Sequence, residues 1–305
     1  MEQALIDRLC RLALSKEPLC VQRCAQGIGN YVYRLDFPDG CCALRCSREP
    51  DAYQETVLRL QQLAELDVPV PRILWNGRLE GWQCLLLTWL EGRDMGVVYP
   101  ALTREQKQAI AQEVEAIQRR VAALPVDVPP DWCWRQEVDS LLDRADRRIR
   151  ENGFFDPEKV NCLRQAAADL DHYFRQVLPV AYLDDISTKN LLIHRSRVSG
   201  VIDVDWIGVG DRLTYMALTR MALLDLQYDT DYTDFLLEAF SPNQTQRKAF
   251  AFYTLLFSVD FMGERGSIFL DKRVPVGTEI INKLNDIFDA LWEDYLKNDT
   301  PVASV

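Results

Sequence analysis

Hydrophobic and polar residues alternate in short runs through the first third of the chain and recur at helical spacing through the remainder. Residues 31–35 alternate like a strand, and the apolar runs 41–46 and 84–90 have the length of buried strands. Residues 1–16 place spaced leucines among charged residues, which predicts an amphipathic helix rather than a signal peptide. The pattern therefore predicts a small sheet and a helix in the N-terminal third.

Beyond Gly92 the pattern is mainly helical. Residues 103–124 begin with a Thr-x-x-Gln capping signal and carry apolar residues three and four positions apart, and the segments 132–151 and 157–177 continue this spacing. Residues 125–130 lie between two helices without a low-complexity tract, so we expect a loop there and not a domain linker. A chain of 305 residues is long for one core and sufficient for two lobes.

A hairpin is predicted near residue 196. The apolar runs 191–193 and 201–202 flank a polar segment, 195–200, that can turn the chain back on itself. The turn is expected near Ser196 and Arg197, which would pair the two runs as antiparallel strands.

Three polar residues surround this hairpin. Asn190 begins the first strand, Asp203 ends the second, and Asp185 lies in the loop that enters the hairpin. In the expected register Asn190 and Asp203 face each other, about 5 Å apart between α-carbons. A carboxylate can orient an attacking hydroxyl and accept its proton, while an amide oxygen and a second carboxylate hold Mg²⁺ against nucleotide phosphates. The triplet favours phosphoryl transfer; loop capping and a strand end are the structural alternative.

The segment 182–211 resembles the catalytic loop and metal-binding motif of the aminoglycoside phosphotransferase and choline kinase superfamily. The usual pattern of these proteins is HGD-x4-N, followed by a hydrophobic residue with Asp and then by G-x-G/A-D. Here Leu-Asp-Asp stands at 183–185 in place of His-Gly-Asp, while Asn190, Asp203 and the Gly-Val-Gly-Asp stretch at 208–211 fit the pattern. The groups expected to touch substrate and metal are therefore kept.

This resemblance implies an α+β, two-lobed, protein-kinase-like fold. It implies a small N-terminal lobe with an antiparallel sheet at 1–92 and a larger, mainly helical C-terminal lobe at 93–305. It also implies a small-molecule kinase in which Asp185 is the catalytic base, Asn190 and Asp203 bind Mg²⁺, and ATP or GTP is the co-substrate. Because the usual His and Gly are missing, the alternative is a catalytically weak, kinase-like nucleotide-binding protein.

The N-terminal lobe offers candidates for nucleotide binding. Gly27 and Gly29 lie in a GxG turn before a strand, which suits a phosphate-covering hairpin as well as a plain tight turn. Arg45 takes the place of the strand Lys that a helix Glu holds in the kinase template, and Glu55 is the expected helix residue. Arg keeps the charge and can grip phosphate bidentately. An Arg45–Glu55 ion pair without nucleotide contact is the alternative.

The expected hinge between the lobes follows the run 84–90. Thr88, Trp89 and Leu90 precede Glu-Gly at 91–92, where such folds recognise adenine through backbone groups. These three residues are the predicted adenine-contact segment.

Composition narrows the function classes. The formal net charge of −11 disfavours nucleic acid and anionic membranes as partners and favours a cationic substrate. No uninterrupted apolar run reaches the roughly 20 residues that a membrane span needs. The nine cysteines lack paired CxxC spacing, which disfavours a zinc site and predicts reduced, buried thiols in a cytoplasmic protein. The two histidines lie apart from any nucleophile elbow, and no GxxxxGK motif occurs.

Candidate acceptor-binding residues follow the metal motif. The segment 221–246 contains no Lys or Arg, and its carboxylates, Asp225 and Asp229 among them, could bind amino groups. A solvated acidic helix face over packed aromatic residues is the alternative. Trp206 is a candidate for the wall of the substrate cleft. Asp205 could supplement the metal or the substrate site, or could form a structural hydrogen bond.

Overall fold

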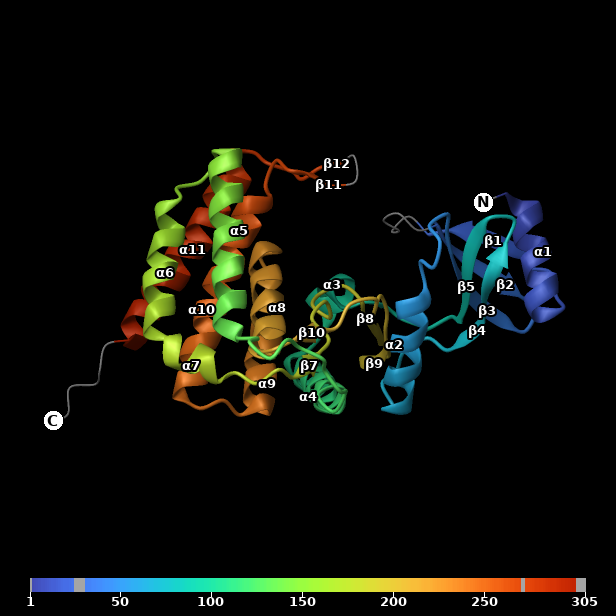
Figure 1. The fold of residues 1–305 in the computed structure, drawn as a ribbon, viewed down its shortest axis with the longest axis horizontal. Coiled ribbons are helices and arrows are strands. Elements are labelled where there is room, and N and C mark those ends of the chain that lie inside the picture. Colours follow the sequence, from blue (N-terminus) through green and yellow to red (C-terminus); the bar gives the residue numbers. More distant parts are fainter. Residues whose placement is uncertain (1, 25–30, 270–271, 300–305) are drawn as a thin grey trace. The chain divides into compact units, whose positions relative to one another are not determined.

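The computed structural model describes residues 2–24, 31–269 and 272–299 (Figure 1). The chain divides into two compact units, each with its own packing. The first unit comprises residues 1–93, 191–195 and 199–205, and the second comprises residues 94–190, 196–198 and 206–305.

The first unit is built on a five-stranded sheet in the order β1-β2-β3-β5-β4, and every neighbouring pair is antiparallel. The strands are β1 (Cys20–Arg23), β2 (Tyr31–Phe37), β3 (Gly40–Ser47), β4 (Ile73–Leu79) and β5 (Trp82–Thr88). The strands predicted at 31–35, 41–46 and 84–90 are therefore confirmed, the last shifted two residues toward the N-terminus. In β3, Arg45 pairs with Val32 on one side and with Leu85 on the other.

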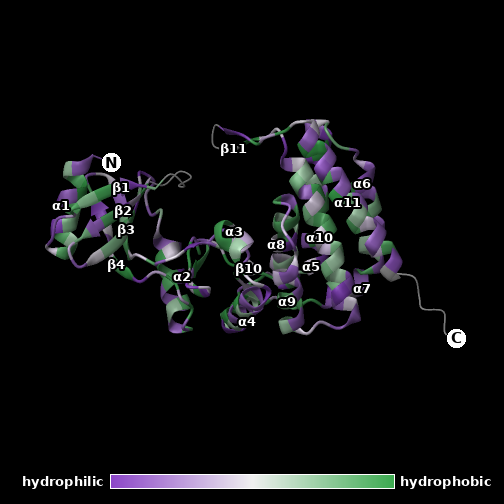
Figure 2. Ribbon diagram, turned by 180° about the vertical axis from the view of Figure 1, so that it is seen from behind, coloured by the Kyte–Doolittle hydropathy of each residue, from purple (hydrophilic) through white to green (hydrophobic). Residues whose placement is uncertain are grey.

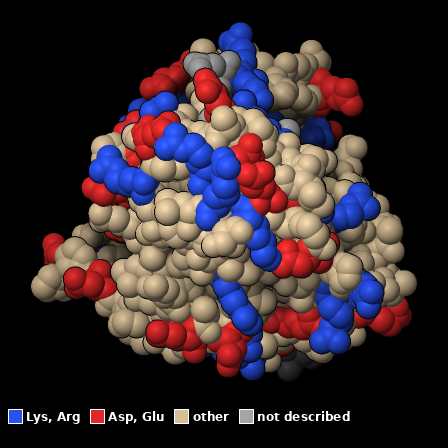
Figure 3. Space-filling view, turned by 90° about the vertical axis from the view of Figure 1, so that its right-hand side faces the viewer, with Lys and Arg blue, Asp and Glu red and all other residues tan. Residues whose placement is uncertain are grey.

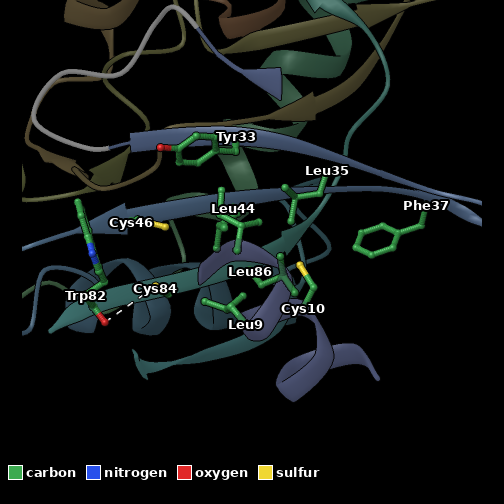
Figure 4. Packing of buried hydrophobic residues seen from close by; sticks show 11 residues of the cluster. Leu9, Cys10, Tyr33, Leu35, Phe37, Leu44, Cys46, Trp82, Cys84 and Leu86 are labelled. Carbon is green, nitrogen blue, oxygen red and sulfur yellow. Dashed lines mark hydrogen bonds between the residues drawn. The ribbon is translucent and has the colours of Figure 1, made fainter. Parts of the chain in front are cut away.

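The sheet buries one face against helix α1 (Gln3–Leu14), the amphipathic helix that the leucine spacing predicts. Leu9 and Cys10 of α1 lie among Leu44 and Leu86 of the sheet (Figure 4), and all four are fully buried. Side chains alternate across a strand. Because Leu44 faces this core, Arg45 next to it is directed to the opposite face of the sheet.

Helix α2 (Gln54–Glu65) follows β3 in the first unit, and three further short strands lie wholly or partly in this unit. These strands are β6 (Arg93–Asp94), β8 (Leu191–His194) and β9 (Arg197–Val201), which form a sheet in the order β6-β8-β9. β8 and most of β9, which the sequence-based boundary grouped with the C-terminal lobe, belong to the first unit.

The β8–β9 hairpin is confirmed, but its turn lies one residue earlier than predicted. Arg195 (φ 49°) and Ser196 (φ 61°) both adopt the left-handed conformation that a two-residue hairpin turn requires. The hydroxyl of Ser199 donates to the carbonyl oxygen of Leu192 at 3.1 Å, in agreement with this register. The predicted pairing of Asn190 with Asp203 across the ladder is therefore wrong, because Asp203 lies beyond the end of β9 at Val201.

The second unit is mainly helical. Its helices are α3 (Met95–Val98), the 3-10 helix η1 (Tyr99–Ala101), α4 (Arg104–Val121), α5 (Trp134–Asn152), α6 (Glu158–Asp169), α7 (Asp171–Gln176), α8 (Leu213–Asp225), α9 (Asp231–Phe240), α10 (Gln244–Glu264) and α11 (Thr278–Asp299). α10 packs against α5, α8 and α11, and α4 packs against α9. Figure 2 shows hydrophobic and hydrophilic residues mixed along these helices.

Local sequence signals located helix α4 well. Thr103 and Gln106 form the predicted capping box, with the Gln106 N–H donating to Thr103 Oγ1 and the Thr103 N–H donating to Gln106 Oε1. The helix predicted at 157–177 is divided into α6 and α7 at the buried residue Leu170. The α+β prediction, with an antiparallel N-terminal sheet and a helical C-terminal part, is confirmed.

Two short ribbons belong to the second unit. β7 (Ala181–Tyr182) pairs antiparallel with β10 (Gly208–Val209), and β11 (Ile268–Phe269) pairs with β12 (Lys272–Arg273). The β7–β10 pair was not predicted, because strands of two residues carry no periodicity.

The thiols and the surface charge complete the description. All nine cysteines are free, as predicted, but only Cys10, Cys46 and Cys84 are buried. On the side of the protein shown in Figure 3, basic and acidic side chains are interspersed. Within the described ranges, none of the helices combines the length and the apolar character needed to cross a bilayer.

Candidate active site

The loop between β7 and β8 brings Asp185 and Asn190 together. The Asn190 side-chain amide donates to the Asp185 carboxylate Oδ2 at 2.9 Å and to the Asp185 carbonyl oxygen at 3.0 Å. Asn190 has a φ of 64°, in the left-handed region that Asn tolerates better than most residues. Asp185 is exposed while residues 186–188 that follow it are buried. The loop therefore holds an accessible carboxylate on an anchored backbone.

Helix α4 supports this loop through Gln118. Its Nε2 donates to the carbonyl oxygen of Leu183 at 2.8 Å, and the Leu183 N–H donates to its Oε1 at 2.9 Å. Both residues are buried. Leu183 occupies the position where the resembled family has His, so a helix side chain supplies backbone support beside the altered motif. Sequence analysis missed Gln118; its only signal was a polar residue next to the apolar stripe of an amphipathic helix.

A second anchor comes from α3. The Gly96 N–H donates to the Thr188 carbonyl oxygen at 2.7 Å. A β-carbon on Gly96 would lie 3.0 Å from that same carbonyl oxygen, so the absence of a side chain permits this approach. The catalytic-loop candidate is thus tied to two helices of its own unit.

The Gly-Val-Gly-Asp stretch has a structural role in the second unit. A β-carbon on Gly208 would lie 2.5 Å from the Tyr182 ring, and one on Gly210 would lie 2.2 Å from the Trp134 ring. Asp211 is buried and accepts hydrogen bonds from the Tyr173 and Tyr253 hydroxyls, at 2.6 and 2.9 Å. Burial raises the pKa of Asp211, and these donors oppose the shift. The Gly-Val-Gly-Asp stretch thus fixes the position of residues 208–211 by close packing and hydrogen bonds.

Asp203 lies in the first unit, just beyond β9. Its φ is 57°, and its side chain remains accessible to solvent. Reduced hydration raises the pKa of Asp203; the positive charge of Arg45 opposes this, and the negative charge of Asp205 adds to it. A carboxylate whose charge is under-compensated by the protein is a suitable ligand for a divalent cation.

Arg45 is held by Asp205 in the same unit. Its two terminal nitrogens donate to the two carboxylate oxygens, with Nη1–Oδ1 at 3.0 Å and Nη2–Oδ2 at 2.5 Å. Thr56 of α2 also donates to Oδ1, at 2.8 Å. Burial disfavours the charged guanidinium, but the bonds and charge of Asp205 outweigh it and raise the pKa of Arg45. The sequence left the role of Asp205 open, and the structure makes it the ion-pair partner of Arg45.

The expected Arg45–Glu55 pair is wrong. The Glu55 side chain is 81% exposed and forms its ion pair with Arg59, one helical turn later. Glu55 is the second residue of α2 and points outward, whereas its neighbour Thr56 is buried and faces Asp205. Gly27 and Gly29, the predicted phosphate-covering glycines, lie outside the described residues.

The predicted adenine-contact segment follows β5. Thr88 ends the strand and exchanges two hydrogen bonds with Arg72: its N–H donates to the Arg72 carbonyl, and its hydroxyl accepts from the Arg72 N–H, both at 2.9 Å. The Trp89 ring packs against the guanidinium of Arg34, whose central carbon lies 4.8 Å from the ring centroid. Leu90 lies against Gly200 of β9, where an added β-carbon would clash.

The acidic candidates after the metal motif have basic partners. Asp225 forms ion pairs with Arg265 at 3.3 Å and with Lys283 at 2.7 Å. Asp229 is held by Lys107, with Nζ–Oδ2 at 2.6 Å. Their charges are therefore compensated within the protein, which argues against these two carboxylates as binding groups for a cationic acceptor. Trp206 is 70% exposed and available for contact with a ligand.

Comparison with known proteins gives a consistent family. The model of the phosphotransferase enzyme family matches residues 21–248. An aminoglycoside 3'-phosphotransferase of Streptomyces fradiae is 28% identical over 215 residues, which cover 65% of this chain and 76% of the relative. One of Escherichia coli is 25% identical over 241 residues, which cover 75% of this chain and 85% of the relative.

Solved structures agree at the level of the fold. A thermostable mutant of aminoglycoside phosphotransferase APH(4)-Ia, in a ternary complex with AMP-PNP and hygromycin B, matches with a TM-score of 0.63 at 13% identity. The match covers 97% of this chain and 99% of that chain. At this identity the likeness concerns the fold alone.

Proposed function

The chain belongs to the phosphotransferase enzyme family, and we propose that it transfers the γ-phosphate of ATP or GTP to a hydroxyl group of a small cationic acceptor. The predicted superfamily and the prediction of a phosphotransferase acting on an alcohol group are confirmed by this membership and by the relatives. The donor, the acceptor and the residues that act on them are our proposal.

The observation that carries the proposal is the Asp185–Asn190 pair. The Asn190 amide donates one hydrogen bond to Oδ2 of the Asp185 side chain and one to the Asp185 carbonyl oxygen, and so fixes the carboxylate relative to the loop backbone. An ionised, accessible carboxylate can orient the acceptor hydroxyl and take its proton as the phosphoryl group arrives. Most of the catalytic effect in such transfers comes from positioning, which the anchored loop supplies.

The donor chemistry of Asn190 and Asp203 fits Mg²⁺. Both amide N–H groups of Asn190 are directed to Asp185, which leaves its Oδ1 oxygen as the group for a cation. Asp203 contributes a solvent-accessible carboxylate, and oxygen ligands of these two kinds are those that Mg²⁺ prefers. Bound Mg²⁺ would neutralise charge on the nucleotide phosphates. Arg45 is the proposed protein cation for those phosphates.

An amine-bearing acceptor is supported by three features. The relatives are named aminoglycoside 3'-phosphotransferases, and the chain carries a formal net charge of −11, which attracts cations. Trp206, with 70% of its surface exposed, offers an aromatic face for a sugar ring or an ammonium group. The acceptor class therefore includes amino sugars and choline-like amines.

The test is Mg²⁺-dependent phosphate transfer from ATP and from GTP to a panel of aminoglycosides, choline-like amines, sugars and other hydroxyl compounds. Asp185→Ala should abolish transfer while nucleotide affinity stays nearly unchanged. Asp127→Ala, an exposed carboxylate in the loop before α5, is the matched control and should keep full activity. Turnover that survives in Asp185→Ala would contradict the assignment of the base. Nucleotide binding without transfer by the wild-type protein would favour a kinase-like binding protein.

A further inference from the structure

Arg45, the predicted phosphate-binding cation, forms an ion pair with a residue distant in sequence. Arg45 and Asp205 are 160 positions apart, and both carboxylate oxygens of Asp205 accept from the guanidinium. The Arg45 side chain is only 13% exposed, and its guanidinium carbon lies 5.3 Å from the centroid of the Tyr53 ring. A buried guanidinium needs such a partner, because an uncompensated charge in the interior is costly.

The partner comes from an unexpected element. In the kinase template a carboxylate on the helix after the strand holds the strand cation. Here that helix, α2, contributes the hydroxyl of Thr56, and the carboxylate comes from the loop after β9. Thr56 is buried and donates to the same Oδ1 atom that receives Arg45 Nη1. The helix and the loop therefore meet at one oxygen of Asp205.

We propose that Asp205, held in place by Thr56, positions Arg45 for the nucleotide phosphates and so replaces the helix carboxylate of the kinase template. This inference rests on the proposed function. Asp205 stands two residues after Asp203 in the same loop, so a single segment carries a proposed metal ligand and the group that orients the phosphate-binding cation. A bidentate carboxylate suits Arg better than Lys, which explains why the strand cation is Arg45.

The geometry disfavours the other roles for Asp205. Oδ1 already accepts from Arg45 and from Thr56, and Oδ2 accepts from Arg45 at 2.5 Å. Three of the roughly four lone-pair positions of the carboxylate are therefore used within the protein, which leaves little capacity for a metal ion or an acceptor. Asp205 is accordingly a positioning residue that acts through Arg45.

The experiment is a double-mutant cycle read out as ATP affinity by calorimetry, with EDTA present so that no metal contributes. The variants are Asp205→Asn, Arg45→Met and the double variant. Asp205→Asn should weaken ATP binding about tenfold or more, because a charge-assisted pair is lost. In the Arg45→Met background the same change should alter ATP affinity less than about twofold, because Asp205 then has no guanidinium to position. If the two residues acted independently, the loss would instead be the same in both backgrounds.

Two controls separate positioning from folding. Adenosine lacks phosphates, so its affinity should be equal in all variants. Asp39→Asn, which breaks a surface ion pair with Lys16 in the same unit, should leave ATP affinity unchanged. Thr56→Val keeps the shape of the side chain and removes only the hydroxyl; it should weaken ATP binding by a smaller factor than Asp205→Asn, and it tests the inference even if Asp205→Asn folds poorly.

The outcomes are distinct. An equal loss from Asp205→Asn in both backgrounds would overturn the inference, because Asp205 would then act independently of Arg45. An unchanged ATP affinity in Asp205→Asn and Thr56→Val, with wild-type binding intact, would overturn the inference and leave the proposed function standing. Wild-type protein that binds no ATP and no GTP under any condition would overturn the proposed function together with the inference.

Discussion

Gln118 and Leu183 exchange two hydrogen bonds across 65 positions of sequence, one in each direction, at 2.8 and 2.9 Å. The side-chain amide of Gln118 thus acts as a substitute backbone partner for a buried residue two positions before Asp185. This arrangement supports the loop where the usual His-Gly of the family is absent, and it makes Gln118 a positioning residue for the proposed base.

Gln118→Ala should destabilise the protein and impair catalysis. The change leaves the N–H and C=O of Leu183 buried without partners, at about 1–3 kcal/mol each, so the free energy of unfolding should fall by about 2–6 kcal/mol. At temperatures where the variant stays folded, kcat should fall more than about tenfold because the loop is less well positioned, with a smaller change in nucleotide affinity. Urea unfolding and steady-state kinetics measure the two effects.

Gln112→Ala is the matched control for Gln118→Ala. Gln112 is exposed on the same helix, so its truncation should change the unfolding free energy by less than about 0.5 kcal/mol. Wild-type kcat in a folded Gln118→Ala variant would show that the loop does not depend on this anchor.

Asp203→Asn should raise the Mg²⁺ concentration required for half-maximal transfer by about tenfold or more, because a charged oxygen ligand becomes neutral. Asn is the informative replacement, since Asp203 has a φ of 57° and Asn tolerates that conformation better than Ala. Titration of Mg²⁺ at saturating nucleotide measures the effect. A wild-type Mg²⁺ requirement would remove Asp203 from the set of metal ligands, whereas adenosine affinity should stay constant in either case.

The sequence pattern predicted the elements that are determined by residues close together in the chain. The capping box at Thr103 and Gln106 depends on residues three positions apart, and the strand at 41–46 was recognised from one short apolar run. The hairpin turn was misplaced by one residue because Arg195 and Ser196 adopt left-handed conformations without glycine or asparagine to mark them.

Pairings between distant residues could not be predicted in this way. The motif singled out Asp185, Asn190 and Asp203, but it did not show that Asp205 would hold Arg45 or that Gln118 would hold Leu183. The same limit explains the acidic segment. Asp229 has no basic neighbour in sequence and was a candidate for binding a cation or for a solvated helix face, yet Lys107 of α4 reaches it across 122 positions.

Asp229→Ala should lower the free energy of unfolding more than the double variant that removes both Asp229 and Lys107. The Lys107 side chain is 7% exposed and the Asp229 side chain is 53% exposed, so removal of Asp229 leaves a buried ammonium group uncompensated. We expect a loss of about 1–3 kcal/mol in unfolding free energy, below the value for a fully buried pair because Asp229 is half exposed. Lys107→Met with Asp229→Ala should recover part of this loss in urea unfolding. A double variant less stable than Asp229→Ala would contradict the explanation.

The Lys107–Asp229 pair also predicts how the free energy of unfolding changes at low pH. Loss of hydration opposes ionisation of Asp229, but the bonds from Lys107 and Tyr99 prevail and lower its pKa. The folded state therefore holds this proton less tightly than the unfolded chain, and the contribution is present above the ordinary pKa of Asp, about 3.9. It is lost as the pH falls through the lowered pKa. Between pH 5 and about 2, stability should decline less steeply in Lys107→Met than in the wild type, as measured by urea unfolding at each pH.

Gly210→Ala should destabilise the second unit strongly. An added β-carbon would lie 2.2 Å from Cε3 of Trp134, and the φ of +134° is itself unfavourable for a residue with a side chain. The Trp134 ring has little room to move, because it is 5% exposed and its Nε1–H donates to the Tyr253 hydroxyl at 2.6 Å. Overpacking and backbone strain each cost about 1–3 kcal/mol, so we expect a loss of about 2–6 kcal/mol.

Gly153→Ala separates the two terms. Gly153 ends α5 with a φ of +67°, and an added β-carbon would meet no atom within 4 Å, so only the backbone term of about 1–2 kcal/mol applies. Thermal and urea unfolding of both variants should therefore show Gly210→Ala as the more damaging. Equal losses would mean that Trp134 yields without cost, and the Gly-Val-Gly-Asp stretch would then owe its second glycine to backbone conformation and not to close packing.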